Sequence, residues 1–156
     1  MPGTPATDGL TIRPAVETDL PAIVAMLADD PLGATRESPD DLTPYVEAFK
    51  DLCGDPHQQL VVAVRDERVV GTLQLTFLPG LSRRGATRAL VEGVRVHADE
   101  RGSGLGTVLL EWAIDTARRA DCRLIQLTSD ATRTDAHRFY ERLGFEASHV
   151  GFKLAL

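Results

Sequence analysis

Apolar and polar residues follow two spacings along this chain, one typical of strands and the other typical of helices. Residues 10–13 alternate like a short strand, and residues 18–27 then follow helical spacing with Pro21 in the first turn. A second helix is predicted to start near Ser38 and Pro39, because serine can cap a helix and proline fits its first position. Gly54 is expected to end that helix.

Strand-like segments dominate the middle of the chain. Residues 59–65 and 68–78 predict a hairpin, and residues 87–96 predict the next strand after a polar loop at 79–86. The final third predicts four more elements. These are a helix with a broad apolar face over residues 103–120, a buried strand at 123–128, a helix at 136–143 and a strand at 145–156.

The arrangement predicts one mixed α/β (α+β) domain over residues 10–156, with six to seven strands and about four flanking helices. Residues 1–9 are rich in Pro, Gly and Thr and are expected to form a disordered tail. With 43% hydrophobic and 26% charged residues, the 156-residue chain has the proportions of an ordinary globular protein.

Charge and targeting signals exclude several classes of protein. A formal net charge of −6 argues against general binding of nucleic acids or anionic membranes. No apolar run approaches the roughly 20 residues of a membrane span, and the first nine residues lack the pattern of a signal peptide. Cys53 and Cys122 are too few for a disulfide scaffold, so the cytoplasm is the expected location.

The most informative segment is VRVHADERGSGLGT at residues 94–107, where a strand, a glycine turn and a helix follow one another. Glycines let the backbone approach a ligand closely, and a helix N-terminus offers unpaired N–H groups with partial positive charge. The first turn of this helix contains no acidic residue. The segment therefore predicts a phosphate-binding turn.

Two better-known phosphate loops do not fit these residues. A P-loop needs a lysine after its last glycine, whereas Gly106 is followed by Thr107 and Val108. A dinucleotide fingerprint needs the spacing G-x-G-x-x-G, whereas glycines at 102, 104 and 106 place the third one position early. A tight connection between strand and helix, with no ligand, is the simpler alternative.

The same turn resembles the signature of the GNAT superfamily of N-acetyltransferases, which is Arg or Gln, two residues, Gly, one residue, then Gly or Ala. Residues 101–106, RGSGLG, match this signature in full. Residues 136–145, AHRFYERLGF, resemble the second hallmark of the family, A-x-x-F-Y-x-x-x-G-F. Residues 94–97 resemble the fourth strand of the family and residues 10–27 its first strand and helix, so the likeness covers nearly the whole chain.

The resemblance implies a mostly antiparallel central sheet whose fourth and fifth strands are splayed apart to admit acetyl-CoA. It implies that backbone N–H groups of the turn bind the pyrophosphate and that strand backbone pairs with the pantetheine arm. The implied cofactor-binding residues are Val94, Arg95, Val96, Arg101, Gly102, Ser103, Gly104, Leu105, Gly106, Thr107, Ser129 and Arg133. No metal is expected, since the four histidines show no ligand spacing.

Two residues are implied to be catalytic. Tyr140 matches the general acid of many family members, and a phenol of pKa about 10 suits a departing thiolate whose thiol has a pKa of about 8.5. Glu92 corresponds to an active-site glutamate of several members and is the candidate base. Strict alternation would place Glu92 on one strand face with Val94 and Val96.

Each of these assignments has an alternative. Tyr140 can simply pack in an amphipathic helix, and Glu92 can form a structural ion pair. Asp130, after the fifth predicted strand, is a rival base. Many family members carry an asparagine near the place of Arg133, which can therefore reach either the cofactor phosphates or the substrate.

The expected function is transfer of an acetyl group from acetyl-CoA to a primary amine of a small molecule or peptide, by direct attack in a ternary complex. A non-catalytic domain that binds or senses acyl-CoA on the same fold is the alternative. The acceptor-facing segments, 31–54 and 79–88, carry no recognisable signature, although Arg83, Arg84 and Arg88 form a basic patch. No nucleic acid or membrane partner is expected, and a homodimer is a candidate assembly.

Overall fold

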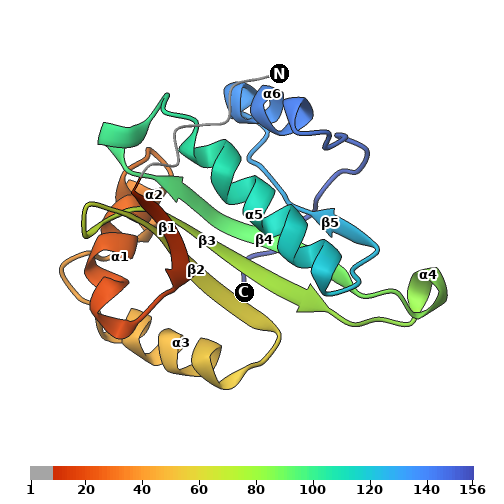
Figure 1. Ribbon diagram of the computed structural model, residues 1–156, viewed down its shortest axis with the longest axis horizontal. Helices are drawn as coiled ribbons and strands as arrows, with labels where there is room; N and C mark the ends of the chain where they lie inside the picture. The colour runs from red at the N-terminus through yellow and green to blue at the C-terminus, as the bar shows by residue number, and fades with distance from the viewer. Residues whose placement is uncertain (1–8) are drawn as a thin grey trace.

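A computed structural model describes residues 9–156 and shows a five-stranded sheet with helices on both faces (Figure 1). The strands are β1 (Leu10–Pro14), β2 (Gln58–Arg65), β3 (Arg68–Leu78), β4 (Arg88–Val96) and β5 (Leu124–Gln126), and they lie in the order β1-β2-β3-β4-β5. The first three pairings are antiparallel, whereas β4 and β5 run parallel. The mixed and mostly antiparallel sheet is confirmed.

Four helices have nine or more residues within the described part of the chain: α1 (Leu20–Ala28), α3 (Thr43–Gly54), α5 (Leu105–Arg119) and α6 (Thr134–Arg142). Two single turns, α2 (Gly33–Arg36) and α4 (Ser82–Gly85), and two 3-10 turns, Glu17–Asp19 and Ala98–Glu100, complete the secondary structure. Within residues 9–156, no helix has the length and apolar character needed to cross a membrane.

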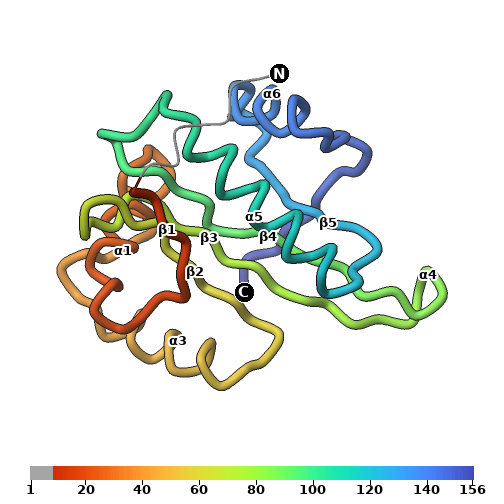
Figure 2. The backbone as a smooth tube through the Cα atoms, in the orientation of Figure 1, coloured from red at the N-terminus to blue at the C-terminus, as the bar shows by residue number. Residues whose placement is uncertain are grey.

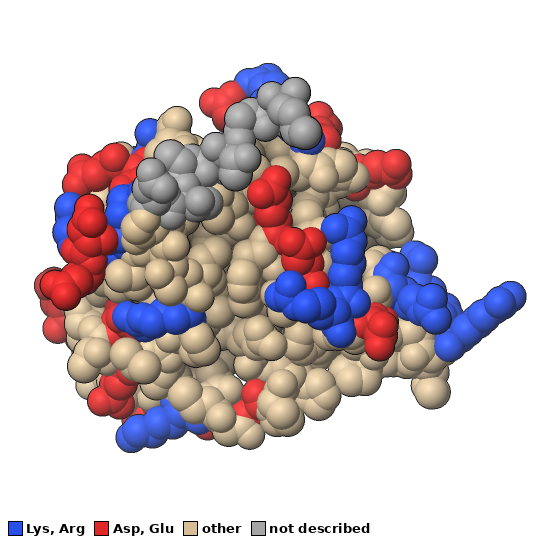
Figure 3. Space-filling view, viewed as in Figure 1, with Lys and Arg blue, Asp and Glu red and all other residues tan. Residues whose placement is uncertain are grey.

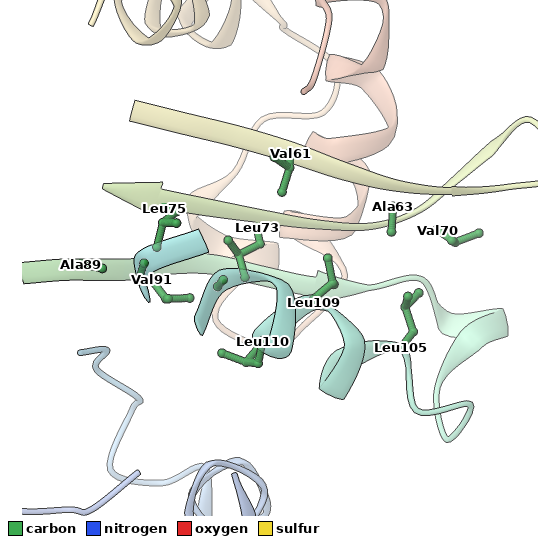
Figure 4. Close-up of a cluster of buried hydrophobic side chains, with 12 residues drawn as sticks. Val61, Ala63, Val70, Leu73, Leu75, Ala89, Val91, Leu105, Leu109 and Leu110 are labelled. Carbon is green, nitrogen blue, oxygen red and sulfur yellow. The ribbon is translucent and has the colours of Figure 1, made fainter. Parts of the chain in front are cut away.

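Alternation along the strands divides the core between the two faces of the sheet. On one face, Val61 and Ala63 of β2 pack with the fully buried Leu109 and Leu110 of α5 (Figure 4). On the other face, Leu60, Val62 and Val64 pack against α1 and α3. Helix α5 packs closely on β3 at Gly71. A Cβ at this position would lie only 3.0 Å from Cδ1 of Leu109, so there is no room for a side chain there.

A β-bulge interrupts the alternation in β4. The pairing with β3 passes from Thr72↔Arg95 to Gln74↔Glu92, so that Gly93 and Val94 together oppose Leu73. Gly93 has a φ of +60°, a left-handed conformation that glycine adopts without steric cost.

The bulge corrects the predicted placement of Glu92. Ala89 and Val91 pack in the cluster under α5 before the bulge, and Val94 and Val96 pack there after it. Glu92 therefore does not share a face with Val94 and Val96 and points to the opposite side of β4. Gly93 lies near α1 on that side, since a Cβ there would be 3.9 Å from Leu27.

Several other expectations are corrected. The sheet has five strands in the described residues instead of six to seven, because residues 145–156 form no strand and join no ladder. The second helix begins at Thr43 with Pro44 in its first turn, and the backbone N–H of Ser38 donates instead to the hydroxyl of Tyr45 at 2.8 Å. The expected tail at 1–9 lies outside the described residues except for Gly9.

An ion pair fixes the entry into α1. Asp19 is buried and accepts two hydrogen bonds from the Arg13 guanidinium, at 2.7 and 3.0 Å, and one from the backbone N–H of Val16 at 2.8 Å. These donors outweigh the burial of the carboxyl and lower the pKa of Asp19. β1 is thereby joined to the first helix.

Candidate active site

The sheet opens between β4 and β5. The two strands pair over three residue positions only, from Arg88↔Leu124 to Leu90↔Gln126. Beyond Leu90, β4 continues to Val96, and no other strand of the described chain pairs with its β5-facing edge. The expected splaying of the fourth and fifth strands is confirmed, and it leaves backbone groups of β4 available to a ligand.

The glycine turn lies at the end of β4 and leads into α5. Gly102 and Gly104 have φ values of +82° and +86°, and Gly104 is the N-cap of the helix. The backbone N–H groups of Gly104, Leu105, Gly106 and Thr107 donate to no acceptor in the described chain, and the first turn contains no acidic residue. Four donors at a helix N-terminus suit a pyrophosphate.

Two of the other glycine-turn residues make specific contacts. Arg101 forms an ion pair with Asp29 at 3.1 Å, which ties the turn to the end of α1. Ser103 donates from its hydroxyl to the carbonyl of Glu100 at 2.6 Å and holds the turn closed. Gly106 lets α5 approach α6, because a Cβ there would lie 3.4 Å from the ring of Phe139.

Polar atoms without partners line the open end of the sheet. Oγ of Ser129, after β5, and Nε of Arg95, on β4, are buried and have no hydrogen-bond partner among residues 9–156. Buried polar atoms are normally paired, so such atoms indicate a place for a ligand. Together with the four open backbone donors, they fit a cofactor that carries phosphates and amide groups.

Tyr140 lies on α6, half-buried between two aromatic rings. Its ring centroid is 5.2 Å from that of Phe139 and 6.0 Å from that of Phe145. Burial raises the pKa of Tyr140, while the positive charges of Arg133 and Arg95 oppose that rise. The phenol therefore keeps its proton at neutral pH and can donate it. Its hydroxyl bonds to no described residue.

Two arginines from different elements, Arg95 and Arg133, lie near Tyr140, and a third, Arg36, lies near Asp130. Arg95 forms an ion pair with Asp30 at 3.2 Å, and its charge helps to lower the pKa of that carboxyl. Arg133 lies close enough to act on Tyr140, Asp30 and Asp130, and Arg36 of α2 also lowers the pKa of Asp130. Neither Arg36 nor Arg133 forms an ion pair with any described carboxylate.

The carboxylates of the site differ in their partners. Asp130 accepts from the backbone N–H and hydroxyl of Thr132, at 2.9 and 2.5 Å, and these bonds lower its pKa. Asp30 accepts from the backbone N–H of Gly33 at 2.6 Å and pairs with Arg95. The side chain of Glu92 is exposed and forms no hydrogen bond or ion pair with another described residue.

A family model described as "Acetyltransferase (GNAT) family" matches residues 21–145. The chain belongs to the GNAT acetyltransferase family. N-acetyl transfer is therefore its activity, and none of the comparisons supports the non-catalytic alternative.

Similar proteins include two curated enzymes. The aminoalkylphosphonate N-acetyltransferase of Salmonella typhimurium is 30% identical over 145 residues, which are 93% of this chain and 90% of that enzyme. The glucosamine 6-phosphate N-acetyltransferase of Trypanosoma brucei brucei is 33% identical over 89 residues, 57% of this chain and 58% of that enzyme. A solved structure titled a transcriptional regulator, from Bacillus halodurans C-125, is 50% identical with a TM-score of 0.91 and covers 94% of this chain and 99% of its own.

The cysteines and histidines of this GNAT acetyltransferase do not form a further centre. No group of three His, Cys, Asp or Glu that could hold a metal occurs within residues 9–156. Burial raises the pKa of Cys122, so its thiol stays protonated, and Cys53 is exposed.

The basic patch predicted at Arg83, Arg84 and Arg88 lies away from the glycine turn. Arg83 and Arg84 form the turn α4, with φ values of +54° and +60°, at the tip where β3 passes to β4. Figure 3 shows basic side chains projecting from this side of the molecule. The nine residues of β4 separate α4 from the glycine turn by about 30 Å.

Sequence analysis missed Asp30 and Arg36 as members of the site. Both lie in or beside the segment 31–54, which was expected to face the acceptor but carries no signature. Arg36 reaches the site only through the single turn α2, which has no amphipathic period to predict it. The presence of an arginine in a segment expected to face the acceptor was the one available signal.

Proposed function

We propose that this acetyltransferase uses acetyl-CoA to acetylate the primary amine of a small molecule that also carries an anionic group, such as a phosphonate or phosphate. One observation supports the choice of acceptor: Arg95 and Arg133 lie near Tyr140, Arg133 and Arg36 lie near Asp130, and neither Arg36 nor Arg133 has an ion-pair partner in the described chain. Guanidinium groups bind phosphonate and phosphate in a bidentate manner. The two curated relatives are named for amines that carry such groups.

The glycine turn is proposed to hold the cofactor. The open N–H groups of Gly104, Leu105, Gly106 and Thr107 would bind its pyrophosphate, and the free edge of β4 at Val94 and Val96 would pair with its pantetheine arm. The unpaired hydroxyl of Ser129 suits an amide or carbonyl of the same arm. Acetyl-CoA supplies the activated acetyl group as a thioester.

The proposed reaction is direct attack by the amine in a ternary complex. An alkylamine of pKa about 10.4 is protonated at neutral pH, and freeing it costs about 4.6 kcal/mol. Glu92 is the proposed acceptor of that proton, directly or through water, because its carboxylate is exposed and unpaired within residues 9–156. The nitrogen forms its bond to the acetyl carbon as the carbon–sulfur bond breaks, and Tyr140 gives its proton to the sulfur. The second proton, which the nitrogen loses as it becomes an amide, restores the phenol of Tyr140.

Steady-state kinetics with two acceptors test the role of the arginines. We compare 2-aminoethylphosphonate with propylamine, which lacks the anionic group, in Arg36→Gln and Arg133→Gln variants. Loss of one charged hydrogen bond should raise KM for the phosphonate about 10-fold to 100-fold and leave KM for propylamine and acetyl-CoA within about 2-fold. Arg142→Gln is the matched control, because Arg142 is an exposed arginine of α6 with no ion pair in the described chain.

Two results would contradict this acceptor. Equal kcat/KM for propylamine and aminoethylphosphonate in the unmodified enzyme would show that the site does not select an anion. A rise in KM for acetyl-CoA in Arg133→Gln, with KM for the phosphonate unchanged, would assign Arg133 to the cofactor phosphates.

A further inference from the structure

A row of polar side chains crosses the middle of the sheet on the face away from α5. Gln58, Thr76, Gln74 and Glu92 belong to β2, β3 and β4, which Figure 2 shows side by side. The register pairs Gln58 with Thr76 and Gln74 with Glu92. Their neighbour Leu75 packs in the cluster under α5, so alternation places the polar row on the opposite face. The row runs from the core to the exposed Glu92.

The side-chain amide of Gln58 is held in one orientation. Its Oε1 accepts from Nε2 of Gln74 at 2.9 Å and from the hydroxyl of the buried Thr76 at 2.8 Å. On its other side, the backbone N–H of His57 lowers the pKa of Asp55, and the side chain of Gln58 contributes to the same shift. An ionised carboxyl only accepts hydrogen bonds, so the N–H side of the Gln58 amide faces Asp55 and its oxygen faces β3.

The orientation of Gln58 also determines that of Gln74. Nε2 of Gln74 donates to the oxygen of Gln58, and turning the Gln74 amide around would bring two acceptor oxygens together. Oε1 of Gln74 accepts no hydrogen bond from another residue of the described chain. Gln74 is half-buried, so its oxygen has lost part of its water and is open to a donor from a ligand.

Glu92 supplies a second acceptor beside this oxygen. It lies directly opposite Gln74 in the ladder, and side chains at such positions have Cβ atoms about 5 Å apart. Glu92 comes two residues after Leu90, the last position at which β4 pairs with β5. The two acceptors therefore lie where the sheet opens. Neither the carboxylate of Glu92 nor Oε1 of Gln74 has a donor within residues 9–156, which suits a group with several N–H donors.

We infer that Oε1 of Gln74 accepts a hydrogen bond from the nitrogen of the acceptor amine and thereby selects primary amines. The inference rests on the proposed reaction, in which an ammonium group loses one proton to Glu92 and a second proton restores the phenol of Tyr140. The third hydrogen stays on the nitrogen and becomes the N–H of the product amide. Gln74 holds this retained hydrogen, which orients the nitrogen during the attack.

The retained hydrogen distinguishes a primary amine from its N-methyl derivative. A protonated N-methyl amine has two hydrogens on nitrogen, loses both in the reaction and gives an amide without an N–H. A methyl group would then meet Oε1 of Gln74. Because the bond to Gln58 prevents the Gln74 amide from turning, its oxygen would stay without a donor, and the transition state would be less stable.

Steady-state kinetics with two related amines test this selection. In the unmodified enzyme, kcat/KM for 2-aminoethylphosphonate should exceed that for its N-methyl derivative about 10-fold to 100-fold. Gln74→Leu should reduce this preference about 10-fold, because leucine has a similar size and no acceptor. The KM for acetyl-CoA should stay within about 2-fold, since Gln74 is proposed to contact only the amine.

Two further variants separate a contact with the amine from a structural role. Gln74→Glu keeps an oxygen acceptor but cannot donate to Gln58, so it should keep the preference for the primary amine within about 3-fold. A role that acts only through Gln58 would affect Gln74→Glu and Gln74→Leu alike. Gln59→Leu is the matched control, because Gln59 lies opposite Leu75 on the α5 face of the sheet and should leave the preference unchanged.

Three outcomes would overturn the inference. The first is equal kcat/KM for the primary amine and its N-methyl derivative in the unmodified enzyme, a result that needs no variant. The second is an unchanged preference in Gln74→Leu, and the third is an equal loss of preference in Gln74→Leu and Gln74→Glu, with the folded state of both verified by circular dichroism.

Failure of the proposed function would give a different result. Propylamine and N-methylpropylamine carry no anion, so their ratio of kcat/KM tests Gln74 even if the acceptor needs no phosphonate. Glu92→Gln is measured alongside. Unchanged kcat in Glu92→Gln would refute Glu92 as the base, whereas the preference for the primary amine in Gln74→Leu reports on Gln74 alone.

Discussion

The two ends of the sheet are built differently. β2 and β3 pair over eight residue positions under a helix whose central leucines are fully buried, whereas β4 and β5 pair over three. At the paired end, backbone groups satisfy one another and side chains fill the core. At the open end, the backbone N–H groups of residues 104–107, the hydroxyl of Ser129 and Nε of Arg95 have no hydrogen-bond partner within the described chain. The first end is therefore built for stability, whereas the second is the end proposed to bind the cofactor.

The largest expected effect is at the open end. Tyr140→Phe removes the proposed general acid, so kcat should fall about 10²-fold to 10⁴-fold while the free energy of unfolding changes little. The reason is that the hydroxyl of Tyr140 bonds to no described residue, and its ring packing is kept. Thiol release from acetyl-CoA with a good amine acceptor measures the rate.

Tyr45→Phe is the matched control, because the chain has two tyrosines. The hydroxyl of Tyr45 accepts from the backbone N–H of Ser38 and donates to Glu37 at 3.2 Å, so its loss should affect the 38–45 segment and leave the chemical step intact. Unchanged turnover in Tyr140→Phe would refute the general-acid role.

At the paired end, Leu109→Ala should affect stability rather than chemistry. Leu109 is fully buried and packs against Gly71, so its truncation leaves a cavity that the close-packed strands cannot fill. The free energy of unfolding should fall by about 2–5 kcal/mol in urea titration. Val108→Ala, on the half-buried side of α5, should cost less. Equal losses in the two variants would contradict a core centred on Leu109.

A smaller effect is expected at Asp19, and it depends on pH. The native pKa of Asp19 is lowered, so its ion pair with Arg13 stabilises the fold above the unfolded carboxyl pKa of about 3.9 and is lost as pH falls through the native pKa. At pH 7, Asp19→Asn should cost about 1–2 kcal/mol. The difference in the free energy of unfolding between the unmodified protein and Asp19→Asn should begin to narrow below about pH 4 and close as pH falls through the native pKa of Asp19.

Urea titrations of both proteins at pH 7, 5, 4 and 3 measure this difference. Asp29→Asn is the control, since the pair of Asp29 with Arg101 is exposed at the surface and should contribute less. If the loss of unfolding free energy in Asp19→Asn stays constant down to pH 3, the charge of Asp19 does not contribute to stability.

The sequence predicts the local elements well and the long-range ones less well. The hairpin of β2 and β3, the glycine turn and α5 follow from alternation, turn residues and helical spacing, all of which act over a few residues. Residues 145–156 have an equally clear strand pattern but pair with no strand of the described chain. Strand pairing requires a sheet edge formed by residues far away in the sequence, and a local pattern carries no information about that edge.

The candidate site divides in the same way. Tyr140 and the open donors of residues 104–107 were found through motifs, although their roles stay predictions. Asp30 and Arg36 were missed because the fold, and no local pattern, brings them to Arg95 and Asp130. The face of Glu92 was predicted wrongly, because one inserted residue changes the parity of a strand without changing its composition.

The bulge at Gly93 changes which positions of β4 face α5. Odd-numbered residues face the helix in segment 88–91 and even-numbered residues face it in segment 94–96, so the two halves of the strand pack against the helix separately. Substitutions that repack α5 against Ala89 and Val91 need not move the edge at Val94 and Val96. Core substitutions can thus accumulate while the backbone proposed to face the cofactor keeps its position, and directed evolution of stability should start from the first half of β4.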